Sequence, residues 1–328
     1  HPAPYMRPGA AEYYDEHVIP TIGLDAGRID LAGIVTHAWL HAPVARTEEG
    51  WPVIFYSPGG SIPRNFGTFH ALELASRGYI VVAVDHTHEA AVVEFPDGRV
   101  LTDALPTLNA ETLLKMMDVR VDDVRFVLNQ LFEMKNGNFP DHADQALLES
   151  LSEAIDLEKI GIFGHSAGGA TAAQAMHEDA RIDAGIDMDG SMGYLPDHLL
   201  PVALEGLDRP FMLMNSGYND EGEVDSHLTA LDRNFFWNQS TGWKMDVSMP
   251  NGAHFTFTDY QLLLPQLSKK LSLSRQVMHH SIGTVDADHA LAAQRDYITA
   301  FFDHHLKGIP QPLLESPESP YDEVIIVE

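Results

Sequence analysis

Short apolar runs that alternate with helical patterns are the feature that most constrains the fold of this chain. Runs such as PVIFYS, YIVVAV, IGIF and FMLM are almost continuously apolar, which is typical of strands buried on both faces of a parallel sheet. Amphipathic segments separate these runs, and one of them repeats apolar residues at steps of four and three: Met117, Val121, Val124, Leu128 and Leu131. The alternation predicts an α/β fold whose mostly parallel central sheet is covered by helices on both faces.

The two ends of the chain lack this alternation. Residues 1–30 are rich in Pro and Tyr and show no clear period, so we expect an extended lead-in that could include one strand. The last amphipathic helix is expected to end at Gly308, and residues 309–328 to form a surface tail in which EVIIVE adds an edge strand. With no internal repeat and no low-complexity linker, the 328 residues are predicted to form a single domain, 1–328.

Composition excludes several classes of function. The chain has 48 acidic and 20 basic residues and a net charge of −28, which disfavours binding to nucleic acid or to an anionic membrane surface. No run of about 18 apolar residues is present, so no integral membrane span is predicted. The absence of cysteine excludes disulfides, thiolate metal sites and a cysteine nucleophile. The compartment stays open, and the acidity gives secretion a small preference over the cytoplasm.

The segment GIFGHSAGG carries a G-x-S-x-G pattern around Ser166. An apolar strand precedes it and a small-residue helix start follows it, which is the context of a nucleophile elbow rather than of an ordinary strand-to-helix turn. Such a site needs two backbone N–H groups aimed at the developing oxyanion. Ala167 is the candidate for the first, and Gly60 in the glycine loop YSPGGS for the second, although that loop could also be a plain turn.

The general base is expected to be a histidine late in the chain, and the chain has 18 histidines. Among them we choose His254 because it closely follows a late apolar strand, in the loop PNGAHF. The His-x-His pair of VDHTH could also suggest a metal, but no third ligand has a suitable spacing, so no metal site is predicted. Residues next to these positions are candidates for the substrate pocket: Ser61, His86, His88, His165 and Phe255.

The acidic partner of the histidine has more than one candidate. Asp220 in NSGYND lies in the loop where this type of fold usually carries the acid. Asp189 in GIDMDG is the rival, at the end of the preceding strand, and Asp187 lies deeper on the same strand. Fold logic alone gives Asp220 a modest preference.

Six segments in order make the chain similar to a known family: YSPGGS, ELASRGYIVVAVDHTHEA, GIFGHSAGGATAAQAM, RIDAGIDMDGSM, PFMLMNSGY and NGAHFTFTDY. The chain resembles the platelet-activating-factor acetylhydrolases of the plasma and intracellular type II kind, which are α/β-hydrolases. The resemblance implies Ser166 as nucleophile, Asp189 as acid and His254 as base, with Gly60 and Ala167 as oxyanion donors. Asp220 becomes the fallback acid. Two features differ from the family: Pro58 stands where the family often has His, and residues 219–237 look longer than in the plasma enzymes.

These observations lead us to expect a serine hydrolase that cleaves carboxylic esters through an acyl-enzyme, with short-acyl or small esters, or lipids, as substrates. No organic cofactor and no metal is expected. An acyltransferase, a lactonase or a polyester-type esterase could use the same residues. A catalytically silent binding protein on a hydrolase scaffold is the alternative from another class. The sequence makes no prediction of the oligomeric state.

Overall fold

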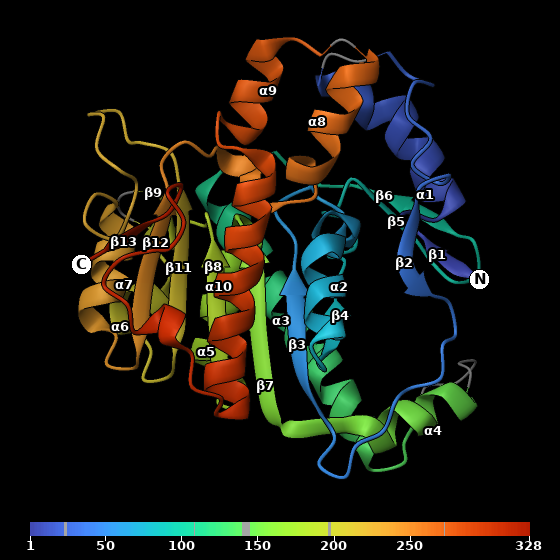
Figure 1. Ribbon diagram of the computed structural model, residues 1–328. Coiled ribbons are helices and arrows are strands. Elements are labelled where there is room, and N and C mark those ends of the chain that lie inside the picture. The colour runs from blue at the N-terminus through green and yellow to red at the C-terminus, as the bar shows by residue number, and fades with distance from the viewer. Residues whose placement is uncertain (23–24, 108, 140–144, 196–197, 272) are drawn as a thin grey trace.

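The structure is a computed structural model that describes residues 1–22, 25–107, 109–139, 145–195, 198–271 and 273–328 (Figure 1). A seven-stranded sheet forms its centre, and six of its strands run parallel while the last runs antiparallel along one edge. In spatial order the strands are β13 (Ile325–Val327), β12 (Lys244–Met249), β11 (Phe211–Ser216), β8 (Ala184–Met188), β7 (Ile155–His165), β3 (Trp51–Ser57) and β4 (Ile80–Ala83). The predicted parallel sheet and the C-terminal edge strand are both confirmed.

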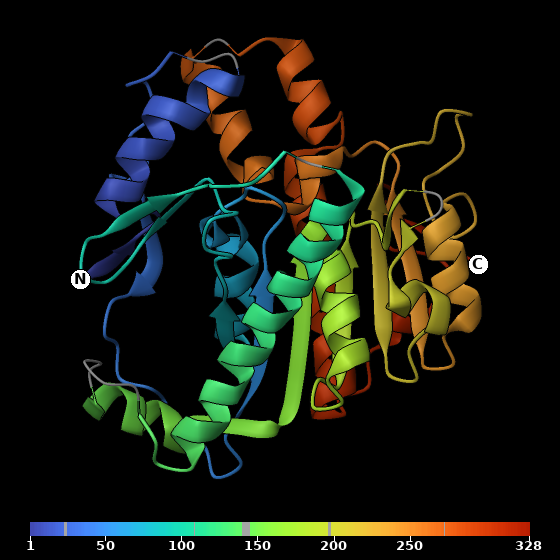
Figure 2. The ribbon, with the colours of Figure 1, turned by 180° about the vertical axis from the view of Figure 1, so that it is seen from behind.

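Helices cover both faces of this sheet, as the apolar runs predict. The face seen in Figure 2 carries α3 (Ala110–Lys135) and α5 (Ala167–Glu178), and the same core includes α6 (Pro201–Glu205) and α7 (Leu231–Gln239). The opposite face carries α2 (Thr68–Ser76) and α10 (Ala287–Lys307). The five apolar positions expected to form one stripe of α3 are all buried. Helix α10 ends at Gly308 as predicted, because this residue takes the left-handed conformation that terminates many helices.

The N-terminal segment corrects one expectation. Among the residues described up to position 30, β1 (Pro2–Pro4) is the one strand, and it pairs with β2 (Val35–Trp39). Helical turns follow in α1 (Pro8–Tyr13), η1 (Tyr14–Val18) and η2 (Ile19–Ile22), so the predicted extended lead-in is wrong. Pro8 occupies the first turn of α1, where a proline fits a helix, and a helix of only six residues is too short to show an apolar period.

A third apolar cluster lies above the carboxyl ends of the parallel strands (Figure 1). It joins the N-terminal helical turns to α8 (Tyr260–Leu271) and α9 (Arg275–Ile282). The hydroxyl groups of Tyr14 and Tyr260 are 2.6 Å apart, and both rings pack on Phe66. These elements therefore form a cap on the edge of the sheet where the site residues are found.

The remaining elements are short. They are β5 (Val92–Glu94), β6 (Val100–Thr102), α4 (Gln145–Ala154), β9 (Gly193–Leu195), β10 (His198–Leu199), η3 (Arg64–Gly67), η4 (His254–Phe257) and η5 (Pro312–Leu314). Within the described ranges, no helix combines the length and the apolar character needed to cross a membrane. The single-domain organisation stays a proposal, supported by one sheet that takes strands from residues 51 to 327.

Candidate active site

Ser166 lies on the sharp turn between β7 and α5. Its backbone has φ 55° and ψ −124°, a conformation that non-glycine residues rarely adopt. The Ser166 N–H donates to the Met188 carbonyl at 2.8 Å, which ties the turn to the end of β8. A side chain at Gly164 would clash with the Gly168 carbonyl, and one at Gly168 with the Ser57 carbonyl. The predicted strand, tight turn and helix around Ser166 are therefore what the chain forms.

Three side chains from separate strand ends form one line of hydrogen bonds. His254 Nε2 lies 3.0 Å from Ser166 Oγ, and His254 Nδ1 lies 2.7 Å from Asp189 Oδ2. Because the carboxylate of Asp189 can only accept, Nδ1 carries the proton and Nε2 is left to accept the Ser166 hydroxyl. The side chain of His254 is 45% exposed, so solvent reaches these three hydrogen-bonded side chains at the histidine.

Asp189 is held from several directions. Its backbone has φ 59° and donates to the Met214 carbonyl at 2.7 Å, while its Oδ1 accepts the Ser216 N–H at 2.7 Å. Burial would raise the pKa of this carboxyl, but the hydrogen bond and charge of His254 outweigh burial and bring the pKa below its usual value. Asp189 is therefore an ionised acceptor for the imidazole.

Asp220, the acid that fold logic prefers, lies elsewhere. It is an exposed residue between Gly217 and Val224, and its carboxylate makes no hydrogen bond to any described residue. The structure therefore brings Asp189, and not Asp220, to the histidine.

His165 packs against His254 and hydrogen-bonds to its backbone. Its ring is buried, lies 4.6 Å from the ring of His254, and donates from Nε2 to the His254 carbonyl at 2.7 Å. Burial, reinforced by the neighbouring imidazole of His254, lowers the pKa of His165 to about 3, so the ring is neutral at physiological pH. Phe255 lies beside both histidines, with ring centroids 5.4 Å from His254 and 6.0 Å from His165.

The glycine loop after β3 reaches the same place. A Cβ at Gly59 would be 3.4 Å from Ser166 Cβ, so the loop packs directly beside the serine. Ala167 is the first residue of α5, and Gly60 is exposed on the loop. Neither backbone N–H donates to another group within the residues the structure describes. Both N–H groups are thus free to donate to a bound oxygen.

The other pocket candidates separate into two groups. Ser61, at φ 59°, and His88, at φ 70°, are exposed on loops after β3 and β4. The ring of His86 is instead 2% exposed and hydrogen-bonds within the protein to Ser57 and Asp123, beneath the glycine loop. His86 therefore belongs to the support of the loop rather than to the surface of a pocket.

Asp187 is a buried carboxyl that the sequence indicated only as the deeper residue of its strand. It is 1% exposed, and its Oδ1 accepts the Gly190 N–H at 2.8 Å. Its Oδ2 has no partner among the described residues. Burial raises the pKa of Asp187 to about 8, against the weaker opposing effect of the Arg233 charge. A neutral carboxyl group therefore lies under the Ser166 turn and the Asp189 loop.

The raised pKa of Asp187 predicts a pH-dependent stability. The native state binds this proton more tightly than the unfolded chain, so stability should fall as the pH rises from near 4 to about 8. Asp187→Asn keeps an acceptor for Gly190 without the ionisation, and should be more stable than the wild type at pH 9 by a few kcal/mol, while the two differ much less at pH 5. Urea unfolding at both pH values, with Asp220→Asn as an exposed control, measures this. Equal pH dependence of wild type and Asp187→Asn would contradict it.

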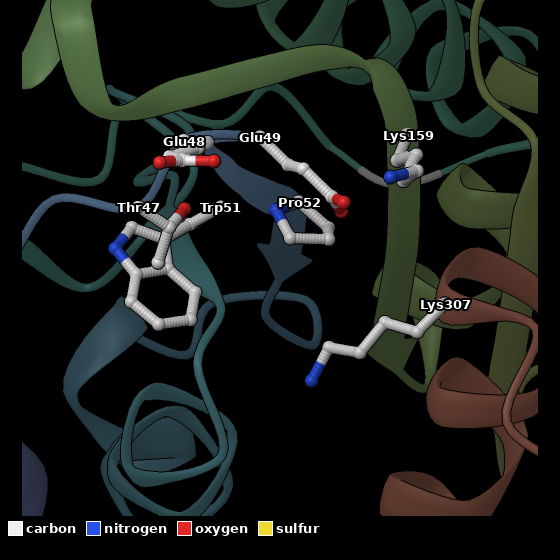
Figure 3. A pocket seen from close by; sticks show the side chains of 8 residues that line it. Thr47, Glu48, Glu49, Trp51, Pro52, Lys159 and Lys307 are labelled. Atoms are coloured by element: carbon white, nitrogen blue, oxygen red, sulfur yellow. The ribbon is translucent and has the colours of Figure 1, made fainter.

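One hollow of the molecule lies away from the three hydrogen-bonded side chains of the site. This hollow, shown in Figure 3, has a volume of about 400 Å³ and is lined by Trp51, Lys159 and Lys307 among others. Trp51 is the first residue of β3, whereas the glycine loop follows the last residue of this strand. The hollow therefore lies at the amino end of β3, away from the site residues. No group of three or more His, Asp or Glu side chains within the described ranges is arranged to hold a metal ion.

Comparison with known proteins decides the family. The family model described as "Platelet-activating factor acetylhydrolase, isoform II" matches residues 28–309. The chain belongs to this family. It is a family of carboxylic ester hydrolases, and the matched range includes Ser166, Asp189 and His254.

Curated relatives agree with this family. A "Probable 1-alkyl-2-acetylglycerophosphocholine esterase" of Arthroderma benhamiae is 28% identical over 282 residues, which cover 85% of this chain and 67% of that protein. A "Platelet-activating factor acetylhydrolase" of Cavia porcellus is 26% identical over 241 residues, covering 66% of this chain and 50% of that protein. The chain thus spans about half to two thirds of the length of these acetylhydrolase-family relatives.

A solved structure adds the fold. The "Ferulic acid esterase from Streptomyces cinnamoneus" is similar with a TM-score of 0.75 and 32% identity, covering all of this chain and 85% of that one. Together with the parallel sheet and its helices on both faces, this similarity makes the fold an α/β-hydrolase fold, as the family resemblance implied.

Proposed function

We propose that this acetylhydrolase-family chain hydrolyses carboxylic esters through an acyl-enzyme on Ser166. The observation that carries the proposal is the line of hydrogen bonds from Ser166 Oγ through His254 to Asp189, at 3.0 Å and 2.7 Å. Nucleophile, base and orienting acid stand in the relation that acyl transfer requires. The low pKa of Asp189 and the strained turn at Ser166 support the same assignment.

In the first step, Ser166 Oγ attacks the ester carbonyl carbon while its proton passes to His254 Nε2. Asp189 stabilises the imidazolium that forms and keeps the ring in the required tautomer. The carbonyl oxygen becomes an oxyanion, for which the free N–H groups of Gly60 and Ala167 are the proposed donors. The tetrahedral intermediate then expels the alcohol, which takes the proton from Nε2.

In the second step, water replaces the alcohol. His254 Nε2 removes a proton from the water as its oxygen attacks the acyl carbon, and returns the proton to Ser166 Oγ as the acid leaves. His254 is 45% exposed on its side chain, so water can reach Nε2 without opening the core. No step of this cycle uses an organic cofactor or a metal ion.

Short-acyl and small esters are the substrates we propose first, in keeping with the acetyl esters named for the family's relatives. An aromatic acyl group is the second candidate, since the solved relative is a ferulic acid esterase. One aromatic side chain next to the base favours it: the half-buried Phe255, whose ring centroid lies 5.4 Å from that of His254. A flat aromatic acid packs well on such a ring.

A panel of esters tests both candidates. On this proposal we expect kcat/KM for p-nitrophenyl esters to be highest at acetate to butyrate and to fall by at least about tenfold by octanoate, because a mismatch in acyl size changes transition-state binding by about 1–3 kcal/mol. If kcat/KM is higher for methyl ferulate than for p-nitrophenyl acetate, esters of aromatic acids become the preferred substrates.

Labelling completes this test. A fluorophosphonate probe is expected to label the native chain once, at Ser166. Absence of both labelling and hydrolysis would contradict the proposal and favour a silent binding protein. Fast acyl transfer to an added alcohol, with slow hydrolysis, would make the chain an acyltransferase.

A further inference from the structure

The apolar stripe of α3 contains one charged side chain. Arg120 is 1% exposed and lies between the buried residues Met117 and Val124. Burying a guanidinium is costly unless it is paired and fully hydrogen-bonded. The hydrogen-bond partners of Arg120 therefore indicate which groups its buried charge serves.

Arg120 pairs with an acid and also binds the glycine loop. Its Nε and one terminal nitrogen form a bidentate pair with the carboxylate of Glu89, at distances of 2.5 to 3.0 Å. Its other terminal nitrogen donates to the Pro58 carbonyl at 2.9 Å. Pro58 directly precedes Gly59 and Gly60, so the ion pair is connected to the loop that carries the proposed oxyanion donor.

A second contact fixes the start of the same loop. Ser57 Oγ lies 3.0 Å from His86 Nε2, and His86 Nδ1 lies 2.9 Å from Asp123, one turn after Arg120 on α3. The Ser61 carbonyl accepts the Ala91 N–H at 3.0 Å. Helix α3 and residues 86–91 thus hold the loop at both of its ends.

Backbone geometry connects this support to the Gly60 N–H. The Gly59 carbonyl and the Gly60 N–H belong to one planar peptide group and point in opposite directions. The Gly59 carbonyl accepts the Ile62 N–H at 3.1 Å, so the Gly60 N–H points away from Ile62. Two successive glycines add little steric restraint of their own, so the orientation of this peptide rests on the Ile62 contact and on the anchored carbonyl of Pro58.

We propose that Arg120, paired with Glu89, is a positioning residue that holds the glycine loop so that the Gly60 N–H donates to the oxyanion. This inference rests on the proposed function and adds residues to it that do not touch the substrate. Losing the Pro58 contact loosens the loop, and a misplacement of about 1 Å at a catalytic group costs about 10²-fold in rate. The loss should appear in kcat, because the oxyanion exists only after the attack.

The experiment separates positioning from a general loss of stability. Arg120→Met leaves Glu89 as a buried unpaired charge and should both destabilise the chain and lower kcat by about 10²-fold. The double variant Arg120→Met/Glu89→Met removes both charges and should recover the melting temperature, because an apolar pair can replace a buried ion pair. Its kcat should stay about 10²-fold low, since the Pro58 carbonyl still lacks its donor.

A transition-state mimic provides the second readout. A trifluoromethyl ketone forms a tetrahedral adduct on the serine. Its inhibition constant should rise in the double variant by the same factor as kcat falls, and the KM of p-nitrophenyl acetate should change little.

Arg120→Lys can still pair with Glu89 but lacks the planar fork that reaches the Pro58 carbonyl, so this variant should show the same loss of kcat while the chain stays folded. Arg125→Met changes an arginine on the same helix that pairs with Glu178 and Asp179 at the end of α5. It is the matched control and should keep wild-type kcat.

Two outcomes are decisive against this inference. A double variant that recovers both melting temperature and kcat would show that Arg120 serves stability alone and would overturn the inference, with the proposed function unaffected. A chain that keeps wild-type activity after Ser166→Ala would instead overturn the proposed function, and with it the role given to the loop.

Discussion

Replacing Ser166 with alanine is expected to lower kcat for p-nitrophenyl acetate by about 10⁶-fold. The change removes the atom that attacks the ester and leaves His254 and Asp189 without a nucleophile to activate. A residual rate above that in water should persist, because the oxyanion donors and substrate binding still contribute. Stopped-flow measurement of product release, with active-site titration of the wild type, gives the ratio.

Controls for this variant are available in the same chain. Ser76→Ala changes an exposed serine at the end of α2 and should keep wild-type kcat. The melting temperature of Ser166→Ala should stay close to that of the wild type, since His254 is the one hydrogen-bond partner of the hydroxyl among the described residues. Labelling of Ser166→Ala by a fluorophosphonate, or hydrolysis at the wild-type rate, would move the nucleophile to another serine.

Replacing Asp189 with asparagine is expected to lower kcat by about 10⁴-fold. The NH₂ group of an asparagine placed against His254 Nδ1 donates a hydrogen bond there, which favours the imidazole tautomer that carries its proton on Nε2. That tautomer cannot accept the Ser166 hydroxyl. The fold should persist, because the asparagine carbonyl can still accept the Ser216 N–H that Asp189 Oδ1 accepts.

The two other candidate acids are the controls for this experiment. Asp220→Asn alters an exposed side chain and should keep wild-type kcat. Asp187→Asn replaces a carboxyl that is already neutral at pH 7, so its kcat at that pH should change far less than that of Asp189→Asn. A larger loss for Asp220→Asn than for Asp189→Asn would assign the acid to Asp220.

The positions of Ser166 and His254 at the ends of strands could be predicted, because the residues around each of them determine where the strand ends. The apolar run before Ser166 and the small residues after it allow one outcome, a strand that turns sharply into a helix. The position of His254 after a late strand follows from the same rule, since the carboxyl ends of parallel strands meet at one edge of the sheet.

The choice of acid could not be made from local pattern. Asp189 and Asp220 both follow apolar strands, and what separates them is a contact across the sheet. The Ser216 N–H donates to Asp189, whereas Asp220 lies in the exposed segment after Gly217. Arg120 was equally hidden, because its partner Glu89 lies 31 residues earlier. An arginine inside an apolar helical stripe is the signal that could have directed attention to it.

Backbone hydrogen bonds connect the ends of neighbouring strands in sequence: Ser166 N–H to the Met188 carbonyl, Asp189 N–H to the Met214 carbonyl, and Gly217 N–H to the Met249 carbonyl. The reacting groups are therefore built into the scaffold, whereas the exposed segment 218–224 leaves and rejoins it between two of these fixed points. For protein engineering this segment is the part to vary. A library confined to it alters the surface beside the site and leaves Ser166, Asp189 and His254 in place.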